Sequence, residues 1–83
     1  MEYYPIGTVV VLRNGTRTIM IYGRKQIQKD TGKEWDYVAC LYPEGNLGDE
    51  YNIFFQHEEI EYIMHTGLKN KSEERMQKVL NSK

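Results

Sequence analysis

Two histidines and several glutamates near the end of the chain could in principle bind a metal ion. The segment reads His57-Glu58-Glu59-Ile60-Glu61, and His65 follows. A helical zinc motif of the form H-E-x-x-H needs its second histidine at position 61, where this chain has a glutamate. We also expect a strand from Ile60 onward, which would separate the two histidines. The pattern therefore predicts a solvated acidic turn and no metal site.

The same segment and the single cysteine are the remaining candidates for catalysis. Glu58, Glu59 and Glu61 could act as an acid–base pair only if burial or a close like charge raised a pKa. Glutamate-rich turns on small domains are usually exposed. Cys40 lies in an apolar run with no neighbouring base, which is typical of a small buried hydrophobe. We therefore expect no enzymatic activity, no catalytic residues and no cofactor.

A loop rich in glycine follows the run that contains Cys40. It reads Tyr42-Pro43-Glu44-Gly45-Asn46-Leu47-Gly48, without the spacing of a phosphate-binding loop, and the acids after it would repel phosphate. Pro43 and the glycines suit a turn, whereas Glu44, Asn46 and Leu47 have no evident packing role. An exposed apolar side chain ringed by polar groups is a typical anchor for a protein partner. We predict that the partner-binding residues are Tyr42, Glu44, Asn46, Leu47 and Tyr51.

Length and composition limit the classes of protein that the chain can form. It has 83 residues, 40% hydrophobic and 28% charged, which indicates one small folded domain. A net charge of −1 and a pI of about 6.1 disfavour general nucleic-acid binding. The start, MEYYPIG, lacks a basic region and a long apolar core, and no apolar run approaches a membrane span. We therefore expect no membrane partner and a cytoplasmic location.

Charge is sorted along the chain in spite of the small net value. Residues 13–33 contain six basic side chains and one acid, whereas residues 34–66 contain acids and no lysine or arginine. The basic second strand could lie beside the acidic third strand and offset it. The alternative is a surface with two signs of charge that steers a partner of the opposite pattern.

The strand pattern predicts a mainly β fold. Ile6–Leu12 and Thr16–Tyr22 are rich in β-branched residues, and Asn14-Gly15 between them is typical of a type I′ hairpin turn. Trp35–Tyr42 carries apolar residues on both faces, which indicates a central strand or a tightly curled barrel. A helical turn at 56–59 should separate strands at 51–55 and 60–65. We predict a small antiparallel SH3-like barrel of about five strands; the alternative is an α+β fold, an open antiparallel sheet with one packed helix.

The last residues have the pattern of a helix of about ten residues. Ser72 is suited to be its N-cap, and the acids that follow favour the positive end of the helix dipole. Met76, Val79 and Leu80 share one face and should dock on the barrel or on a partner. We therefore predict that residues 1–68 form the β-barrel and residues 69–83 a C-terminal helical appendage of the same domain.

Four stretches of the chain resemble a small family of proteins from Gram-positive bacteria. They are Pro5–Val10, Met20–Arg24, Asp36–Gly48 and Phe54–Ile60, of which Asp36–Gly48 is the most specific. The family is called domain of unknown function 4176, and the resemblance covers most of residues 4–67. Its members tend to be encoded near type VII secretion genes and their LXG toxins. The resemblance implies a cytoplasmic adaptor or targeting chaperone that binds the helical export domain of an LXG toxin.

These observations lead to a principal hypothesis and two alternatives. The principal hypothesis is a non-enzymatic protein-binding module whose partner is an LXG toxin or another secretion component. The first alternative is an RNA-binding barrel that uses Arg17, Arg24 and Lys25 near Tyr22. The second is a small-ligand or enzyme site around His57 and the nearby glutamates. Self-association is a further expectation, as a homodimer joined through an edge strand at 51–55. Tyr62 is followed four residues later by Thr66, so a secretion tail of the form Tyr-x-x-x-Asp/Glu is missing there, and we expect that the protein is not the exported cargo.

Overall fold

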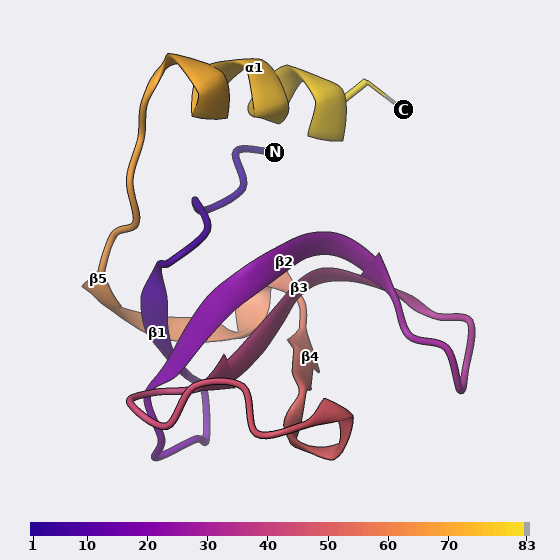
Figure 1. Ribbon diagram of the computed structural model, residues 1–83, viewed down its shortest axis with the longest axis vertical. Coiled ribbons are helices and arrows are strands. Elements are labelled where there is room, and N and C mark those ends of the chain that lie inside the picture. Colours follow the sequence, from indigo (N-terminus) through magenta and orange to yellow (C-terminus); the bar gives the residue numbers. More distant parts are fainter. Residues whose placement is uncertain (83) are drawn as a thin grey trace.

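Five antiparallel strands form one sheet with the spatial order β4-β3-β2-β1-β5 (Figure 1). The computed structural model describes residues 1–82, so the last residue of the predicted appendage, Lys83, lies outside the described residues. The elements are β1 (Val9–Leu12), β2 (Ile19–Ile27), β3 (Glu34–Leu41), the 3-10 turn η1 (Asp49–Tyr51), β4 (Ile53–Phe55), the 3-10 turn η2 (His57–Glu59), β5 (Ile60–His65) and helix α1 (Lys71–Leu80).

The prediction of a mainly β fold with five strands and a C-terminal helix is confirmed. The helical turn expected between the last two strands is η2. β4 and β5 are the two edges, and within residues 1–82 no ladder joins one to the other. The sheet is therefore open, as the alternative prediction stated.

The hairpin of β1 and β2 is confirmed, but its turn differs from the predicted one. Val9 pairs with Met20 and Val10 with Ile19, so residues 13–18 connect the strands. Asn14 has a φ of 67°, whereas Gly15 does not have a positive φ, so the type I′ prediction is wrong. The reason is that β1 continues along β5 after it leaves β2, because Leu12 pairs with Ile60.

A bulge at Gly23 changes the direction of the side chains along β2. The register moves from Ile21 opposite Ala39 to Gly23 opposite Val38, which leaves one extra residue in β2. A Cβ atom on Gly23 would lie 2.6 Å from Cγ1 of Val38, so the position requires glycine. Because the extra residue shifts the alternation, Arg24 shares the inner face with Ile21 and is 9% exposed.

Both faces of β3 are buried, as predicted. Tyr37 and Ala39 are completely buried on the inner face, and Val38 and Cys40 are 3% and 5% exposed on the other. Cys40 is a free buried thiol, as expected of a small hydrophobe. β3 is therefore the central layer between the inner core and the outer face of the sheet.

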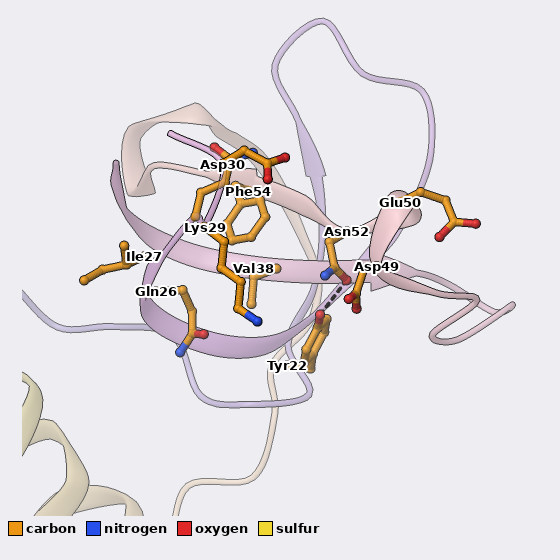
Figure 2. Close-up of a pocket in the computed structure, with 11 residues that line it drawn as sticks. Tyr22, Gln26, Ile27, Lys29, Asp30, Val38, Asp49, Glu50, Asn52 and Phe54 are labelled. Carbon is orange, nitrogen blue, oxygen red and sulfur yellow. Dashed lines mark hydrogen bonds between the residues drawn. The ribbon is translucent and has the colours of Figure 1, made fainter. Parts of the chain in front are cut away.

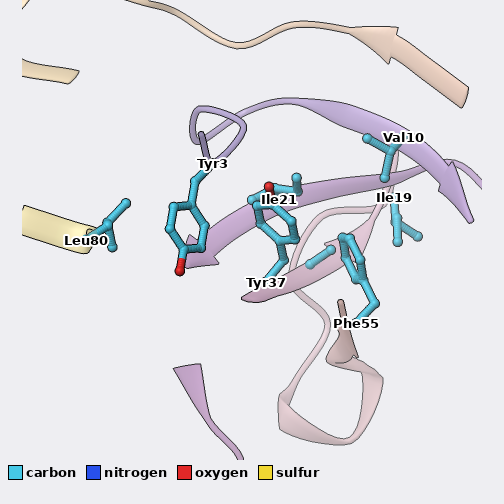
Figure 3. Close-up of a cluster of buried hydrophobic side chains, with 8 residues drawn as sticks. Tyr3, Val10, Ile19, Ile21, Tyr37, Phe55 and Leu80 are labelled. Carbon is cyan, nitrogen blue, oxygen red and sulfur yellow. The ribbon is translucent and has the colours of Figure 1, made fainter. Parts of the chain in front are cut away.

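Tyr37 is the centre of the inner core (Figure 3). Its ring centroid lies 5.2 Å from that of Phe55 and 6.0 Å from that of Tyr3. Its hydroxyl accepts the Tyr4 N–H at 3.0 Å and lies 2.6 Å from Nδ1 of His57. Burial raises the pKa of Tyr37 to about 12.

Helix α1 has the ten residues that were predicted, but it begins with a different cap. Asn70 is the N-cap, and its Oδ1 accepts the Glu73 N–H at 2.9 Å. The prediction of Ser72 as the cap is wrong, because Ser72 already lies inside the helix.

The helix docks through a mainly polar stripe, whereas the sequence predicted an apolar one. Leu80 is buried as expected, but Met76 and Val79 are 41% and 60% exposed, so these two residues do not dock on the sheet. Their contact with a partner stays a prediction. The docked residues are instead Glu73, Gln77 and Leu80.

The N-terminal segment lies between this stripe and the sheet (Figure 1). Gln77 accepts the Tyr3 N–H at 3.0 Å and donates to the Tyr3 carbonyl at 2.7 Å. Arg24 of β2 reaches Glu73 with two hydrogen bonds, of 2.5 and 3.0 Å, and these side chains are 6% and 13% exposed. The hydrogen bonds from Arg24 hold the pKa of Glu73 below its ordinary value.

Removal of Arg24 should destabilise the protein strongly. Arg24→Ala would leave the Glu73 carboxylate without its partner in a site with little water, at a cost of about 3 kcal/mol in the free energy of unfolding. Urea denaturation at pH 7 measures this loss. Arg17→Ala is the matched control, because Arg17 pairs with Glu44 at an exposed site, and its midpoint should stay close to that of the wild type. Equal losses in the two variants would contradict the structural role of Arg24.

The same ion pair should make stability depend on acid pH. The pKa of Glu73 is below 4.5 in the folded protein and near 4.5 in the unfolded chain. Its contribution is therefore complete above about pH 4.5 and is lost as the pH falls through the folded value. Urea denaturation across this range should show a shallower decline for Glu73→Gln than for the wild type. Identical slopes would show that the Glu73 carboxylate does not stabilise the fold.

Candidate protein-binding surface

The loop between β3 and β4 presents three of the predicted partner-binding residues to solvent. Tyr42, Leu47 and Tyr51 are 48%, 51% and 47% exposed. The loop is attached to the start of β2, because the Tyr42 N–H donates to the Thr18 carbonyl and the Thr18 hydroxyl donates to the Tyr42 carbonyl, both at 3.0 Å. These side chains are therefore exposed on a loop whose base is held by the sheet.

The other two predicted residues hold the loop in shape. Glu44 pairs with Arg17 at 2.5 Å, and a hydrogen bond from Arg17 holds its pKa below the ordinary value. Oδ1 of Asn46 accepts the Gly48 N–H at 3.0 Å. The expectation that Glu44 and Asn46 have no packing role is therefore wrong. Leu47, the third residue in that expectation, is exposed at the tip of the loop. The pairing of Arg17 with Glu44 joins positions 27 residues apart, so no local pattern could have shown it.

A hollow of about 490 Å³ lies beside this loop on the outer face of β2, β3 and β4 (Figure 2). Val38 and Phe54 supply its apolar part. Tyr22 lies on one side, and its hydroxyl donates to Oδ1 of Asn52. Residues from η1, from the end of β2 and from the β2–β3 connection complete the rim, namely Asp49, Glu50, Gln26, Ile27, Gln28, Lys29 and Asp30. We call the hollow together with the loop of residues 42–52 the outer surface.

The hollow is not evident from the sequence. Its residues come from three strands and two connections, and the bulge at Gly23 decides that Tyr22 faces outward. The alternation of apolar residues in β3 was the available signal, because it placed Val38 and Cys40 on the face opposite Tyr37.

The model of the family described as Domain of unknown function (DUF4176) matches residues 3–76. The chain belongs to this family. No curated protein and no solved structure matches it. The resemblance to the family inferred from the sequence is therefore confirmed.

The DUF4176 match includes all five strands, the outer surface and helix α1 as far as Met76. Arg24 and Glu73, which form the buried ion pair, both lie within it. Leu80 of the docked stripe lies beyond its end.

The basic residues of β2 do not form ion pairs with the acids of β3. The ion pairs among residues 1–82 are Arg17–Glu44, Arg24–Glu73 and Lys69–Glu2, so none joins a basic residue of β2 to an acid of β3. β2 does lie beside β3, as the interpretation of an offset between the two strands requires, but without a direct ion pair between them. Near the hollow, Asp49 and Glu50 are exposed and take part in none of these ion pairs.

The histidines and the acidic turn are arranged as the sequence indicated. His57 lies in η2 and His65 ends β5, and Glu58 and Glu59 are exposed. Within the described part of the chain, no three His, Cys, Asp or Glu side chains gather where they could hold a metal ion. His57 instead stacks on Tyr4, with ring centroids 5.1 Å apart.

The residues that could have bound RNA are mostly used inside the protein. Arg24 binds Glu73, and Lys25 donates to the Leu80 carbonyl at 2.8 Å. Arg17 is exposed but paired with Glu44. These contacts direct the three cations toward helix α1 or the loop of residues 42–52.

The sheet leaves the predicted edge strand open to pairing. β4 is an edge strand, as predicted, and has three residues, Ile53–Phe55. Pairing of two copies through this edge stays a prediction.

Among residues 1–82 no helix is both long and apolar enough to cross a membrane.

The proximity of Asp49 to Tyr22 can be tested by titration. Burial raises the pKa of Tyr22, and the charge of Asp49 raises it further. Asp49→Asn should therefore lower the pKa of Tyr22 and leave that of Tyr37 near 12. NMR titration of the tyrosine Cζ signals measures both values in one sample. An unchanged Tyr22 pKa would show that Asp49 does not face the hollow.

Proposed function

We propose that this DUF4176 protein is a non-enzymatic protein-binding module that uses its outer surface. The observation that supports the proposal is the exposure of Tyr42, Leu47 and Tyr51 on a loop beside an apolar-floored hollow. Tyrosine is enriched among the residues that contribute most to binding at protein interfaces, and an exposed leucine offers an apolar anchor.

The attachment of the loop favours binding. Hydrogen bonds with Thr18, the Arg17–Glu44 pair and the Asn46 contact restrain the backbone before a partner arrives. A restrained loop loses less conformational entropy on association than a free one, so more of its contact energy appears as affinity.

The partner that we propose is an LXG toxin of a type VII secretion system. Family membership supports this choice, because the resemblance implies small accessory proteins encoded beside such toxins. The protein would act in the cytoplasm as an adaptor or targeting chaperone, and it would hold the helical export domain of the toxin before export.

Co-expression with an LXG protein encoded beside it tests the proposal. The two proteins should elute from a sizing column as one complex, and Leu47→Asp should weaken that complex by about thirtyfold, as for the loss of a strong interface anchor. Leu68→Asp is the matched control, because Leu68 is 75% exposed and lies between β5 and α1, outside the outer surface.

Each outcome decides a different part of the proposal. Separate elution of the two wild-type proteins at several salt concentrations would overturn the partner assignment. If Leu47→Asp binds as well as the wild type does, the loop is only a connection between strands. If both variants lose binding equally, the outer surface is not the binding site.

A further inference from the structure

β5 is an edge strand with one unpaired side. It pairs with β1 on its other side and is the last strand in the spatial order of the sheet (Figure 1). Among residues 1–82, no backbone hydrogen bond outside the ladder with β1 reaches residues 61–65. The free side of β5 therefore carries backbone N–H and carbonyl groups with which another strand can pair.

Three consecutive apolar side chains are exposed on this strand. Tyr62 and Met64 are each 60% exposed, and Ile63 is 38% exposed. β4, the other edge of the sheet, has three residues, and Phe55 among them is completely buried. β5 has six residues, so it is the longer and the more apolar of the two edges. An exposed apolar edge is a typical site of pairing between chains.

Two bulges bend β5 on either side of its centre. Its register against β1 shifts between Ile60 and Tyr62 and again between Ile63 and His65, so β5 carries one extra residue at each place. Bulges twist an edge and restrict its pairing with other chains. The stretch that a second strand can follow is therefore short, and the association that it supports is weak.

The sequence of β5 is complementary to itself in one antiparallel register. When Ile63 lies opposite Ile63 of a second copy, Tyr62 lies opposite Met64 of that copy, and Glu61 lies opposite His65. A thioether attracts the edge of an aromatic ring, and a carboxylate accepts a hydrogen bond from an imidazole. Glu61 and His65 face each other in this register and in no other, because both lie two residues from Ile63.

We propose that β5 is a self-association edge, at which two copies of the protein pair antiparallel about a two-fold axis at Ile63. The symmetry makes the Glu61–His65 and Tyr62–Met64 contacts occur twice each. The pairing joins the two five-stranded sheets into one continuous sheet. The outer surface is built on β2, β3 and β4, toward the other edge, so each copy keeps it free for a protein partner. The inference does not depend on the identity of that partner.

Sedimentation velocity across a concentration series tests the association. A six-residue edge buries less surface than a standard interface, so the Kd of the dimer should be about 100 µM. Ile63→Lys places two ammonium groups on the axis and should weaken the dimer more than about tenfold. Val79→Lys is the matched control, because Val79 is an exposed apolar residue of α1, and it should leave the dimer unchanged. A wild type that stays monomeric at about 1 mM, or equal dimers in the wild type and Ile63→Lys, would overturn the proposal.

Exchange of the charged pair tests the register. Glu61→Lys should weaken the dimer about threefold, and the addition of His65→Glu should restore it, because lysine and glutamate then face each other between copies. Within one copy the two positions are about 13 Å apart along the strand, too far for direct contact. A double variant that dimerises no better than Glu61→Lys would overturn this register.

Cysteine cross-linking locates the axis independently of any change in charge. Ile63→Cys places two thiols directly opposite each other, within the reach of a disulfide bond, so mild oxidation should give a covalent dimer. Met64→Cys is the control, because its thiol faces Tyr62 of the second copy and should cross-link poorly. Cys40 is buried and common to both variants. Equal cross-linking of the two variants, or none at position 63, would overturn an axis at Ile63.

Discussion

The crowding between Gly23 and Val38 is the constraint on which the rest of this structure depends. In a regular strand Tyr22 and Arg24 would lie on the same face, two residues apart. The bulge places them on opposite faces, so Tyr22 borders the outer hollow and Arg24 enters the interface with helix α1. A side chain at Gly23 would meet Val38 at 2.6 Å, and one glycine therefore supports both the binding surface and the docking of the helix.

The helix is joined to the domain in an unusual balance of polar and apolar contacts. Leu80 is its one buried residue, while Glu73 and Gln77 make directed hydrogen bonds to Arg24 and to the backbone of Tyr3. Apolar burial tolerates sliding, whereas paired charges and backbone bonds fix a single register. The helix therefore contributes orientation as much as stability, and Met76 and Val79 stay on its exposed side.

The sequence was sufficient for features that depend on local pattern. Alternation identified β3 as a strand buried on both sides, and the acids of residues 57–59 identified the turn before β5. The sequence was insufficient where one extra residue changes the pairing register of two strands. A period of two cannot show where an extra residue enters β2, so neither the burial of Arg24 nor the hollow beside Tyr22 could be predicted. The polar contacts of the helix could not be predicted for a related reason, because the partner of Glu73 lies 49 residues away.

The contacts of the N-terminal segment also have a consequence for synthesis on the ribosome. Tyr3 is made before its backbone partner Gln77, which lies 74 residues later in the chain. All five strands are complete by His65, so the sheet can pair while Tyr3 still bonds to water. A nascent chain interrupted after β5 would hold a paired sheet in which the Tyr3 backbone still lacks its partner. The contact of Gln77 with Tyr3 therefore forms only after helix α1 has been made.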